Sequence, residues 1–385
     1  MKKFKRRKIC IVSSTRADFG ILSGVIKSLQ KEKSFDTKLF LTGSHLEDKY
    51  GLTFHEASKK NFKIFKKVRI LSKRNDSLSL LKNSEKILNK FAKELKKLSP
   101  NLIILLGDRY EIFCIAYCAF ILGVPIAHLY GGELTQNSLD DSMRHAITKL
   151  SDFHFVSTNR YFKRVIQLGE DKKNIFNIGS VSLDEIDKFK FLNKKEIEKK
   201  LRVNFKKRII ICTMHPETNN LKNINKQVSI LLNSLKKIQS TSVVFTMPND
   251  DLGSDLIRAK IKKFCISNKN AFYFKSLGKD IYFSLVKISN LVLGNSSSGI
   301  IESPSLGTYS INLGLRQLGR TQSKSIFNIN YEKKKIEEAI YKIFKLKKKK
   351  IHNPYFKRNS VRKFISILKK LDFNSIQQKK FIDIL

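Results

Sequence analysis

The sequence has few of the residues that mark cross-linked, fibrous or disordered proteins. Its 385 residues include five cysteines, six prolines, 17 glycines and no tryptophan. Collagen-like and low-complexity chains are far richer in glycine and proline, and a hydrophobic content of 41% is enough to form a buried core. These features exclude a fibrous or disordered chain. At roughly 150 residues per domain, the length predicts two sizeable domains.

The cysteines form no paired motif, and their number is odd. Most of them lie within apolar runs, where a free thiol packs as a small hydrophobic group. We therefore expect neither a disulfide framework nor a zinc site, and a reducing cytoplasm fits this pattern. The five residues are Cys10, Cys114, Cys118, Cys212 and Cys265.

Long hydrophobic runs are also missing. The longest segment without a charged residue or histidine extends from Ile112 to Ala127, which is shorter than the roughly 18 residues that a membrane span needs. Gly123 and Pro125 interrupt this segment. Near the N-terminus, the apolar run Ile9–Val12 is too short for a signal peptide. We therefore expect a soluble protein.

Acidic residues are scarce, because 33 Asp and Glu stand against 76 Lys and Arg and leave a formal net charge of +43. Such a charge suggests nucleic acid or an anionic membrane as a partner. Only 16 of the cations are Arg, however, and phosphate and base recognition favours the planar guanidinium. Much of the Lys excess lies in residues 1–8, 188–207 and 333–350, which we interpret as a terminus, a linker and an outer helix. We therefore predict a solvated basic surface with no specific nucleic-acid or membrane partner. A weak attraction for small anions is the third interpretation.

Short apolar segments alternate with amphipathic ones, a pattern typical of parallel α/β sheets. In the first half, the expected helices are residues 19–29, 78–98 and 112–122. The expected strands of this half are Ile9–Ser13, Lys38–Leu41, Leu102–Leu106, Pro125–Leu129 and Phe153–Val156.

A Lys-rich stretch, residues 188–207, separates this series from a second one. We predict an α/β fold with two doubly wound domains: residues 1–180 together with a C-terminal helix at 358–385, and residues 181–357. No G-x-G-x-x-G fingerprint follows any strand, which disfavours the usual nicotinamide enzymes. The expected helices are 223–238, 254–265, 280–287, 298–307 and 355–371, and the expected strands are Ile209–Thr213, Val243–Met247, Ala271–Phe274, Leu291–Leu293 and Tyr309–Leu313.

Polar residues follow several expected strands of the first half, where open α/β sheets bind ligands. Arg16 follows the first strand, at a helix start whose N–H groups favour an anion. Asp108 follows strand 102–106, a position where burial can tune a carboxyl for acid or base catalysis. Glu133 follows two glycines, and Asp140 and Asp141 open the next helix. Two carboxylates in one cleft can serve as one acid and one base.

Each of these residues also has a purely structural interpretation. Arg16 can lie in solvent beside an ordinary helix cap formed by Thr15 or Asp18. Asp108 can likewise cap the helix that follows it. The two aspartates at 140 and 141 can stabilise a helix N-terminus through its dipole.

In the second half, polar motifs follow two expected strands. His215 lies in a Pro-stiffened turn after strand 209–213, although a lone histidine is more often structural. The segment 294–299, Gly-Asn-Ser-Ser-Ser-Gly, leads into a helix whose N–H groups and hydroxyls would hold a diphosphate. Glu302, one turn later, could accept hydrogen bonds from ribose. The segment is no Walker motif, because the Gly-Lys-Ser/Thr ending is missing, and the alternative is a Ser-rich linker.

Taken in order, these motifs resemble the hydrolysing UDP-N-acetylglucosamine 2-epimerases of sialic acid and legionaminic acid biosynthesis. The resemblance covers nearly the whole chain, and the order of the motifs carries it more than any single motif. The motifs are Ser14–Gly20, Leu41–His45, Gly107–Glu111, Gly131–Glu133, Asp140–Lys149, His215–Thr218, Asn295–Glu302 and Gly314–Arg320.

The resemblance implies a two-domain, glycosyltransferase-B-like fold whose last helix returns to the first domain. It also implies the reaction: UDP leaves C1 while C2 loses a proton, and water then adds to the resulting 2-acetamidoglucal. N-acetylmannosamine and UDP are the products. No metal or redox cofactor is implied, and the partner is the nucleotide-sugar substrate. Whether the chain forms a homo-oligomer stays open.

The resemblance also implies roles for individual residues, with the nucleotide bound mainly by the second domain. Some relatives have a carboxylate just before the double glycine, where this sequence has Tyr130. Which carboxylate is the acid, which is the base, and whether Glu133 takes over, therefore stay open. The implied catalytic residues are Asp108, Glu133, one of Asp140 and Asp141, and His215. The implied substrate-binding residues are Arg16, His215, Asn295, Ser296, Ser297, Ser298, Gly299, Glu302 and Arg316.

Other functions stay open beside this hydrolysing epimerase. The same reaction on a nucleotide-linked diacetamido-trideoxyhexose is the first alternative. A non-hydrolysing epimerase, a glycosyltransferase of the same fold and a basic nucleic-acid-binding protein are the others.

Overall fold

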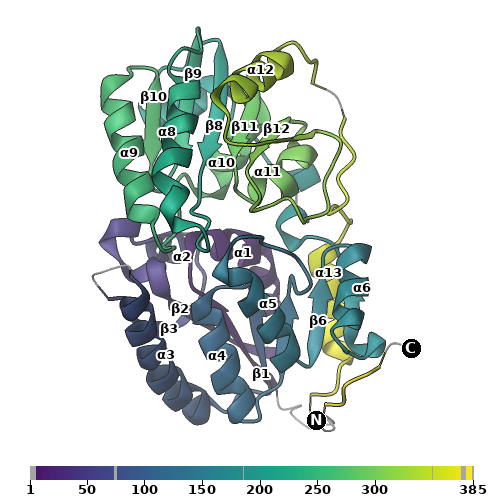
Figure 1. Cartoon of the computed structure of the whole chain (residues 1–385). Coiled ribbons are helices and arrows are strands. Elements are labelled where there is room, and N and C mark those ends of the chain that lie inside the picture. The colour runs from purple at the N-terminus through teal and green to yellow at the C-terminus, as the bar shows by residue number, and fades with distance from the viewer. Residues whose placement is uncertain (1–5, 73–75, 185, 349, 374–378, 384–385) are drawn as a thin grey trace. The chain divides into compact units, whose positions relative to one another are not determined.

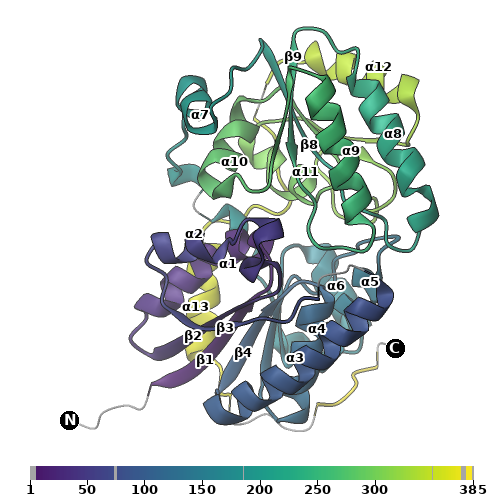
Figure 2. The same cartoon turned by 90° about the vertical axis from the view of Figure 1, so that its left-hand side faces the viewer.

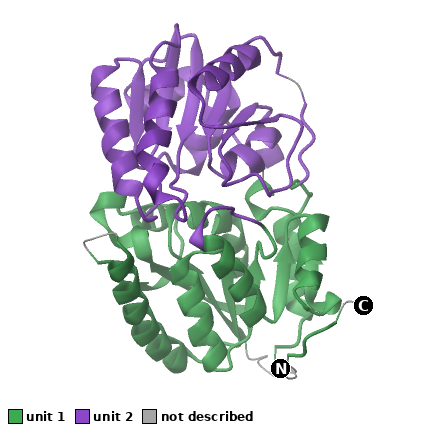
Figure 3. Ribbon diagram, in the orientation of Figure 1, with its two compact units in different colours: residues 1–133, 140–185, 355–385 green, residues 134–139, 186–354 purple. Residues whose placement is uncertain are grey.

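The structure, a computed structural model, describes residues 6–72, 76–184, 186–348, 350–373 and 379–383. These residues form two compact units (Figures 1, 2 and 3). Unit 1 takes its residues from 1–133, 140–185 and 355–385, and unit 2 from 134–139 and 186–354. No helix in the described ranges combines the length and the apolar composition needed to cross a membrane.

Unit 1 is built on a parallel sheet with the strand order β3-β2-β1-β4-β5-β6-β7, which reverses at β1. Its strands are β1 (Arg7–Ser13), β2 (Phe35–Thr42), β3 (Ile64–Val68), β4 (Leu102–Leu106), β5 (Ile126–Leu129), β6 (Phe153–Val156) and β7 (Ile175–Asn177). Its helices are α1 (Arg16–Lys31), α2 (Phe54–Lys59), α3 (Ser77–Leu98), α4 (Tyr110–Ile121), α5 (Leu139–Leu150), α6 (Asn159–Gln167) and α13 (Ser360–Lys370).

The central strands of unit 1 are buried on both faces. Ile9 and Ile11 of β1 pack into a core with α1 and α13, whereas Cys10 and Val12 pack into a second core with α3 and α4. All four side chains are fully buried, and burying an aliphatic side chain of this size contributes roughly 1.5–3 kcal/mol. A strand covered on both sides favours an unbroken apolar run, so polar residues collect at its ends.

Helix α1 begins with a capping box. The Thr15 hydroxyl accepts from the N–H of Asp18 at 3.2 Å, and the Asp18 carboxylate accepts from the N–H of Thr15 at 3.1 Å. The structural interpretation of these two residues is therefore confirmed. Arg16 is the first residue of the helix and is half-buried.

Unit 2 repeats the same architecture, with the strand order β10-β9-β8-β11-β12-β13 and a reversal at β8. The two doubly wound parallel sheets confirm the predicted fold class. The strands are β8 (Arg208–Thr213), β9 (Thr241–Thr246), β10 (Ala271–Phe274), β11 (Leu291–Gly294), β12 (Ser310–Leu313) and β13 (Ile326–Ile329). The helices are α7 (Lys194–Leu201), α8 (Ile224–Leu235), α9 (Ser254–Ser267), α10 (Gly278–Ile288), α11 (Ser298–Ile301) and α12 (Lys333–Phe344).

Three strands lie where the sequence pattern predicts none. Strands β3 and β13 form sheet edges, and most of their side chains are at least partly exposed, so neither shows a long apolar run. Strand β7 has only three residues. The stretch 188–207, interpreted as a linker, contains α7, which packs against α10 and buries Ile197 completely.

The C-terminal helix α13 packs against α1 within unit 1, as expected. It ends at Lys370, however, so the prediction of a helix throughout 358–385 is wrong. The next residue, Leu371, is already extended. Residues 379–383 are described as non-helical and lie on unit 1, where the N–H of Ile382 donates to the Gly169 carbonyl at 3.0 Å. Here backbone and side-chain contacts with unit 1 replace helical hydrogen bonds.

Glu170 is the centre of a buried charged cluster in unit 1. Its carboxylate is 2.7 Å from the Nζ atoms of both Lys149 and Lys379, and 2.9 Å from Nε2 of His154. Burial raises the pKa of Glu170, but the hydrogen bonds and charges of these three partners outweigh burial and bring the pKa to about 2. Burial also lowers the pKa of His154. The cluster holds the C-terminal segment through Lys379.

We expect Glu170→Gln to lower the free energy of unfolding more at pH 7 than at pH 3. The folded-state pKa lies below the ordinary value, so the ionised carboxylate stabilises the fold above that ordinary value, and this contribution is lost as the pH falls toward 2. We expect a loss of about 1–3 kcal/mol at pH 7. Urea unfolding at both pH values measures it.

The matched control is Glu332→Gln, which removes an exposed ion pair with Lys335. Its effect should stay under about 1 kcal/mol at both pH values. An equal effect of Glu170→Gln at pH 7 and pH 3 would contradict the assignment of charge to Glu170.

Candidate active site

The strand order of each sheet creates one topological switch point, where the connections that leave two neighbouring strands run in opposite directions along the sheet. In unit 1 this switch point lies between β1 and β4, and in unit 2 it lies between β8 and β11. Ligands of doubly wound sheets bind beyond the strand ends at such points. The expected functional residues follow these strands and their neighbours.

Asp108 lies directly after β4 and forms an ion pair with the guanidinium of Arg144 from α5. The Arg144 side chain is 3% exposed and also donates to the main-chain carbonyl of Tyr130 at 2.9 Å. One buried cation therefore joins the loop after β4 to the loop after β5. This arrangement fixes the position of the Asp108 carboxylate, which keeps 18% of its own surface exposed.

Buried polar contacts hold the turn that carries Asp108, one from His128 and the others within the Arg109–Glu111 pair. Nε2 of His128 lies 2.7 Å from the Gly107 carbonyl, which can only accept, so Nε2 carries the proton. Burial lowers the pKa of His128 to about 3 and keeps its ring neutral. Arg109 pairs with Glu111 through two contacts of 3.1 Å. Burial raises the pKa of Glu111, and the charge of Arg109 opposes that rise.

The loop after β5 has a constrained backbone. Tyr130 has a φ of 66° and Gly132 a φ of 73°, and a Cβ atom at Gly132 would lie 2.8 Å from the Tyr161 carbonyl oxygen. The Tyr130 hydroxyl lies 2.7 Å from the hydroxyl of Ser180, inside unit 1. The Tyr130 side chain is therefore engaged in the core, and the residue is only 4% exposed.

Glu133 ends this loop and is 1% exposed. Its carboxylate accepts from the Ser157 hydroxyl, after β6, at 2.8 Å. Two of the expected carboxylates in unit 1, Asp108 and Glu133, thus each have a buried polar partner. Residues Asp140 and Asp141 lie in the first turn of α5, where the positive end of the helix dipole also suits them structurally.

The residues between Glu133 and Asp140 belong to unit 2. The Leu134 carbonyl accepts from Arg320 at 2.9 Å, and the N–H of Leu139 donates to the Thr218 hydroxyl at 2.9 Å. Helix α5, which carries Arg144, therefore begins on residues that contacts within unit 2 fix in place. Nothing in the local sequence pattern predicts this path of the chain.

In unit 2, the His215 main chain is held on both sides by one amide. The Asn295 side chain accepts from the His215 N–H at 2.7 Å and donates to the His215 carbonyl at 2.8 Å. Arg316 and Gln317, after β12, donate to the Asn295 carbonyl at 3.3 and 3.1 Å. The structure therefore brings His215, Asn295 and Arg316 together, with the Asn295 side chain engaged by protein rather than directed to a ligand.

The serine segment that follows Asn295 leads into α11. Ser296, Ser297 and Ser298 are half-buried, and the hydroxyl of Ser298 accepts from Tyr282 at 2.8 Å. Gly299 lies in the short helix, and Glu302 follows its last residue with 7% exposure. These serines thus follow the strand β11 at the switch point of unit 2.

The chain matches a known protein family over most of its length. A family model described as UDP-N-acetylglucosamine 2-epimerase matches residues 27–369. The chain belongs to this family. It is therefore an enzyme, an epimerase of nucleotide-linked sugars.

Two curated relatives match nearly the whole length of this epimerase. A GDP/UDP-N,N'-diacetylbacillosamine 2-epimerase (hydrolyzing) from Campylobacter jejuni is 40% identical, covering 98% of this chain and 100% of the relative. Polysialic acid biosynthesis protein P7 from Escherichia coli is 35% identical, covering 98% and 97%.

The crystal structure of UDP-GlcNAc 2-epimerase from Neisseria meningitidis bound to UDP-GlcNAc matches with a TM-score of 0.78. It covers 94% of this chain and all of that one at 20% identity. A likeness at this identity establishes the fold, two Rossmann-like domains of the glycosyltransferase-B type.

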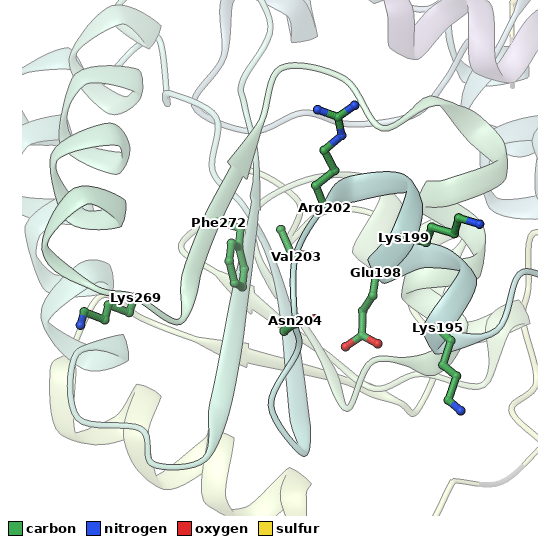
Figure 4. A pocket seen from close by; sticks show the side chains of 8 residues that line it. All are labelled: Lys195, Glu198, Lys199, Arg202, Val203, Asn204, Lys269 and Phe272. Atoms are coloured by element: carbon green, nitrogen blue, oxygen red, sulfur yellow. The ribbon is translucent and has the colours of Figure 1, made fainter.

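A pocket of about 540 Å³ in unit 2 is lined by none of the residues expected for function (Figure 4). Figure 4 shows Lys195 and Lys269 pointing away from each other, and Arg202 pointing away from Glu198. The lysine and arginine side chains that line the pocket do not converge on one point, as recognition of an anion would require. The lining residues are Lys195, Glu198, Lys199, Arg202, Val203, Asn204, Lys269 and Phe272.

Three residues near the expected site were not singled out from sequence. His128 and Ser157 are a strand residue and a lone serine, and no local pattern distinguishes them from core positions. Asp251 is different, because it lies in the polar loop after β9 and its carboxylate is 3.4 Å from Nδ1 of His215. Ligands of open α/β sheets bind beyond the carboxyl ends of strands, so the polar loop after β9 was a further place in the sequence to look for functional residues such as Asp251.

We expect Gly294→Ala to destabilise this epimerase. Gly294 has a φ of 130°, and a Cβ atom there would lie 1.9 Å from the carbonyl oxygen of Thr213 on the paired strand β8. Backbone strain and this clash should together cost more than about 2 kcal/mol. Urea unfolding followed by circular dichroism measures the loss.

The control is Gly20→Ala in α1, where nothing lies within 4 Å of the added atom. It should leave stability unchanged or raise it by up to about 1 kcal/mol. An unchanged unfolding midpoint for Gly294→Ala would show that the strand pairing tolerates a side chain there.

Proposed function

We propose that this epimerase is hydrolysing and acts on nucleotide-linked N,N'-diacetylbacillosamine, a 2,4-diacetamido-2,4,6-trideoxyhexose. The products would be the free nucleotide and the C2 epimer of the sugar. The observation that supports this substrate is the Campylobacter jejuni relative, whose name gives both the sugar and the hydrolysing reaction. UDP-N-acetylglucosamine is the second candidate, supported by the family description and the polysialic acid relative.

The proposed chemistry begins with an elimination. A base removes the proton from C2 while the C1–O bond breaks and the nucleotide leaves with the bonding electrons, which gives a 2-acetamidoglycal. The oxygen of a water molecule then bonds to C1 while one of its protons passes to a base, and an acid returns a proton to the opposite face of C2. Because the C2 proton is weakly acidic, negative charge on the departing diphosphate must be stabilised early.

We assign the proton transfers to the carboxylates of unit 1. Asp108, held by Arg144, and Glu133, held by Ser157, are fixed by buried partners, as acid–base catalysis requires. One of Asp140 and Asp141 is the third candidate. The buried hydroxyl of Tyr130 supports the view that the carboxylate at this turn is supplied by Glu133.

We assign the nucleotide to unit 2. Ser296, Ser297, Ser298 and Gly299 would bind the diphosphate with hydroxyl and backbone N–H groups. Glu302 would accept hydrogen bonds from ribose. His215 and Arg316, with Arg16 from unit 1, would supply positive charge to the phosphates or hydrogen bonds to the sugar. Asn295 would act by holding His215, because its side-chain amide is bound to that main chain.

The substrate assignment predicts distinct products in heavy water. We expect UDP- or GDP-linked N,N'-diacetylbacillosamine to give free nucleotide and the manno-configured sugar deuterated at C2. UDP-N-acetylglucosamine should react with a kcat/KM lower by roughly 10-fold or more, because it lacks the second acetamido group that the proposed sugar-binding site would contact. NMR of the three reactions measures both results.

Other outcomes point elsewhere. Preferred turnover of UDP-N-acetylglucosamine would establish the second candidate. A product that keeps its nucleotide would identify a non-hydrolysing epimerase. The absence of turnover without an added sugar acceptor would favour a transferase and overturn the proposal.

Asp108→Asn should fold normally and lose at least ~10²-fold in kcat, the scale typical of an acid or base group. Asp187→Asn, at an exposed position in unit 2, is the matched control and should keep wild-type turnover. Steady-state kinetics and circular dichroism of both variants provide the test. Near wild-type turnover of Asp108→Asn would remove this carboxylate from the mechanism.

A further inference from the structure

The side chain of Asp251 faces the imidazole of His215 within unit 2. Its Oδ2 is 3.4 Å from Nδ1 of the ring, and the two side chains are 9% and 11% exposed. The two residues come from different loops, after β9 and after β8. A carboxylate in this position can act on the ring even if it never touches the substrate.

The loop that carries Asp251 is built around one buried guanidinium. Arg258 of α9, 8% exposed, donates to the carbonyls of Pro248 and Asn249 at 3.1 and 2.9 Å and to the Ser254 hydroxyl at 2.7 Å. The N–H of Ser254 in turn donates to the Asp251 carbonyl at 3.0 Å. These bonds close the loop at both ends, so Asp251 occupies a defined position.

The position of His215 is fixed independently. The Asn295 amide binds both its N–H and its carbonyl, and the chain continues into Pro216. Two rigid supports therefore set the distance between the ring and Asp251. This arrangement differs from a surface ion pair, in which two long side chains find each other at an entropic cost.

The contact determines the protonation pattern of the ring. An ionised carboxylate only accepts hydrogen bonds, so Nδ1 must be the protonated nitrogen and Nε2 carries the lone pair in the neutral ring. When the ring gains a second proton, it is at Nε2, and the carboxylate stabilises the imidazolium. The same logic operates in the Ser-His-Asp triad, where the aspartate fixes the tautomer without reacting.

We infer that Asp251 is a positioning residue that fixes the tautomer and orientation of His215, and that Arg258 holds the loop in which it lies. This inference rests on the proposed function, in which His215 faces the diphosphate as it leaves. Asp251 then keeps the proton at Nδ1 and directs Nε2 toward the leaving group. As negative charge grows on the diphosphate, the imidazolium form of the ring, which is protonated at both nitrogens and stabilised by the Asp251 carboxylate, donates a hydrogen bond to it from Nε2.

The tautomer can be tested without turnover. The whole protein, labelled with ¹⁵N at histidine only, carries seven histidines, and His215→Gln assigns the signal of interest. Two-bond ¹H–¹⁵N spectra should show the Nδ1–H tautomer for His215 in the wild type. In Asp251→Asn the amide can donate to Nδ1 instead, so the signal should shift toward the Nε2–H form or become mixed. An Nε2–H tautomer in the wild type would overturn the inference.

The kinetic test uses three variants, two at Asp251 and one at Asp255 in the first turn of α9. Asp251→Asn should lower kcat by at least ~10-fold with a smaller change in KM, because a neutral amide cannot stabilise the imidazolium that donates to the departing diphosphate. Asp255→Asn is the matched control: it removes a nearby carboxylate that lies 2.9 Å from Arg258 and belongs to a side chain that is 57% exposed. It should keep the wild-type kcat and tautomer. Asp251→Glu should recover part of the kcat lost in Asp251→Asn.

The outcomes separate the two proposals. If the enzyme turns over none of the nucleotide sugars, the proposed function fails, whereas the spectra still decide the tautomer. Titration of UDP into the wild type and Asp251→Asn by calorimetry then reports whether His215 contacts the diphosphate. An unchanged tautomer together with unchanged kcat in Asp251→Asn would reduce Asp251 to a structural loop residue.

Discussion

Parallel pairing of strands buried on both faces is the constraint on which the rest of this structure depends. Side chains of successive strand residues, such as Ile9 and Cys10, enter opposite cores, so neither face of the central strands tolerates an unpaired polar group. All strands of a parallel sheet end at the same edge. Polar residues excluded from the strands therefore collect there, and the order of the sheet leaves a switch point at that edge.

Several of the charged residues that become buried are paired with an opposite charge. Arg144 binds Asp108, Arg109 binds Glu111, and Glu170 is surrounded by two lysines and a histidine. Removing a charge from water is costly unless a partner and further hydrogen bonds replace the lost hydration. In this enzyme, the partners also join loops that are far apart in sequence, so one interaction both satisfies a charge and positions a candidate catalytic group.

The loops at the strand ends owe their shape to a few constrained residues. Tyr130 adopts a positive φ that few non-glycine residues adopt, and Gly294 approaches the Thr213 carbonyl so closely that no side chain fits. Such conformations persist only where surrounding contacts impose them. The two hydrogen bonds between the Asn295 side chain and the His215 main chain fix the backbone in a similar way. Together these supports would hold the proposed catalytic and nucleotide-binding residues in place before any substrate binds.

The sequence by itself determined the buried strands, their alternation with helices and the positions at which polar motifs follow them. These features are local, because a strand that is covered on both faces needs apolar side chains at every successive position. The exposed edge strands β3 and β13 carried no such run, and only pairing with a neighbour made them strands. Likewise, only the tertiary structure decided that residues 134–139 belong to unit 2, that Tyr130 turns its hydroxyl inward and that Asp251 meets His215. Each of these depends on contacts between residues distant in sequence, which no local periodicity records.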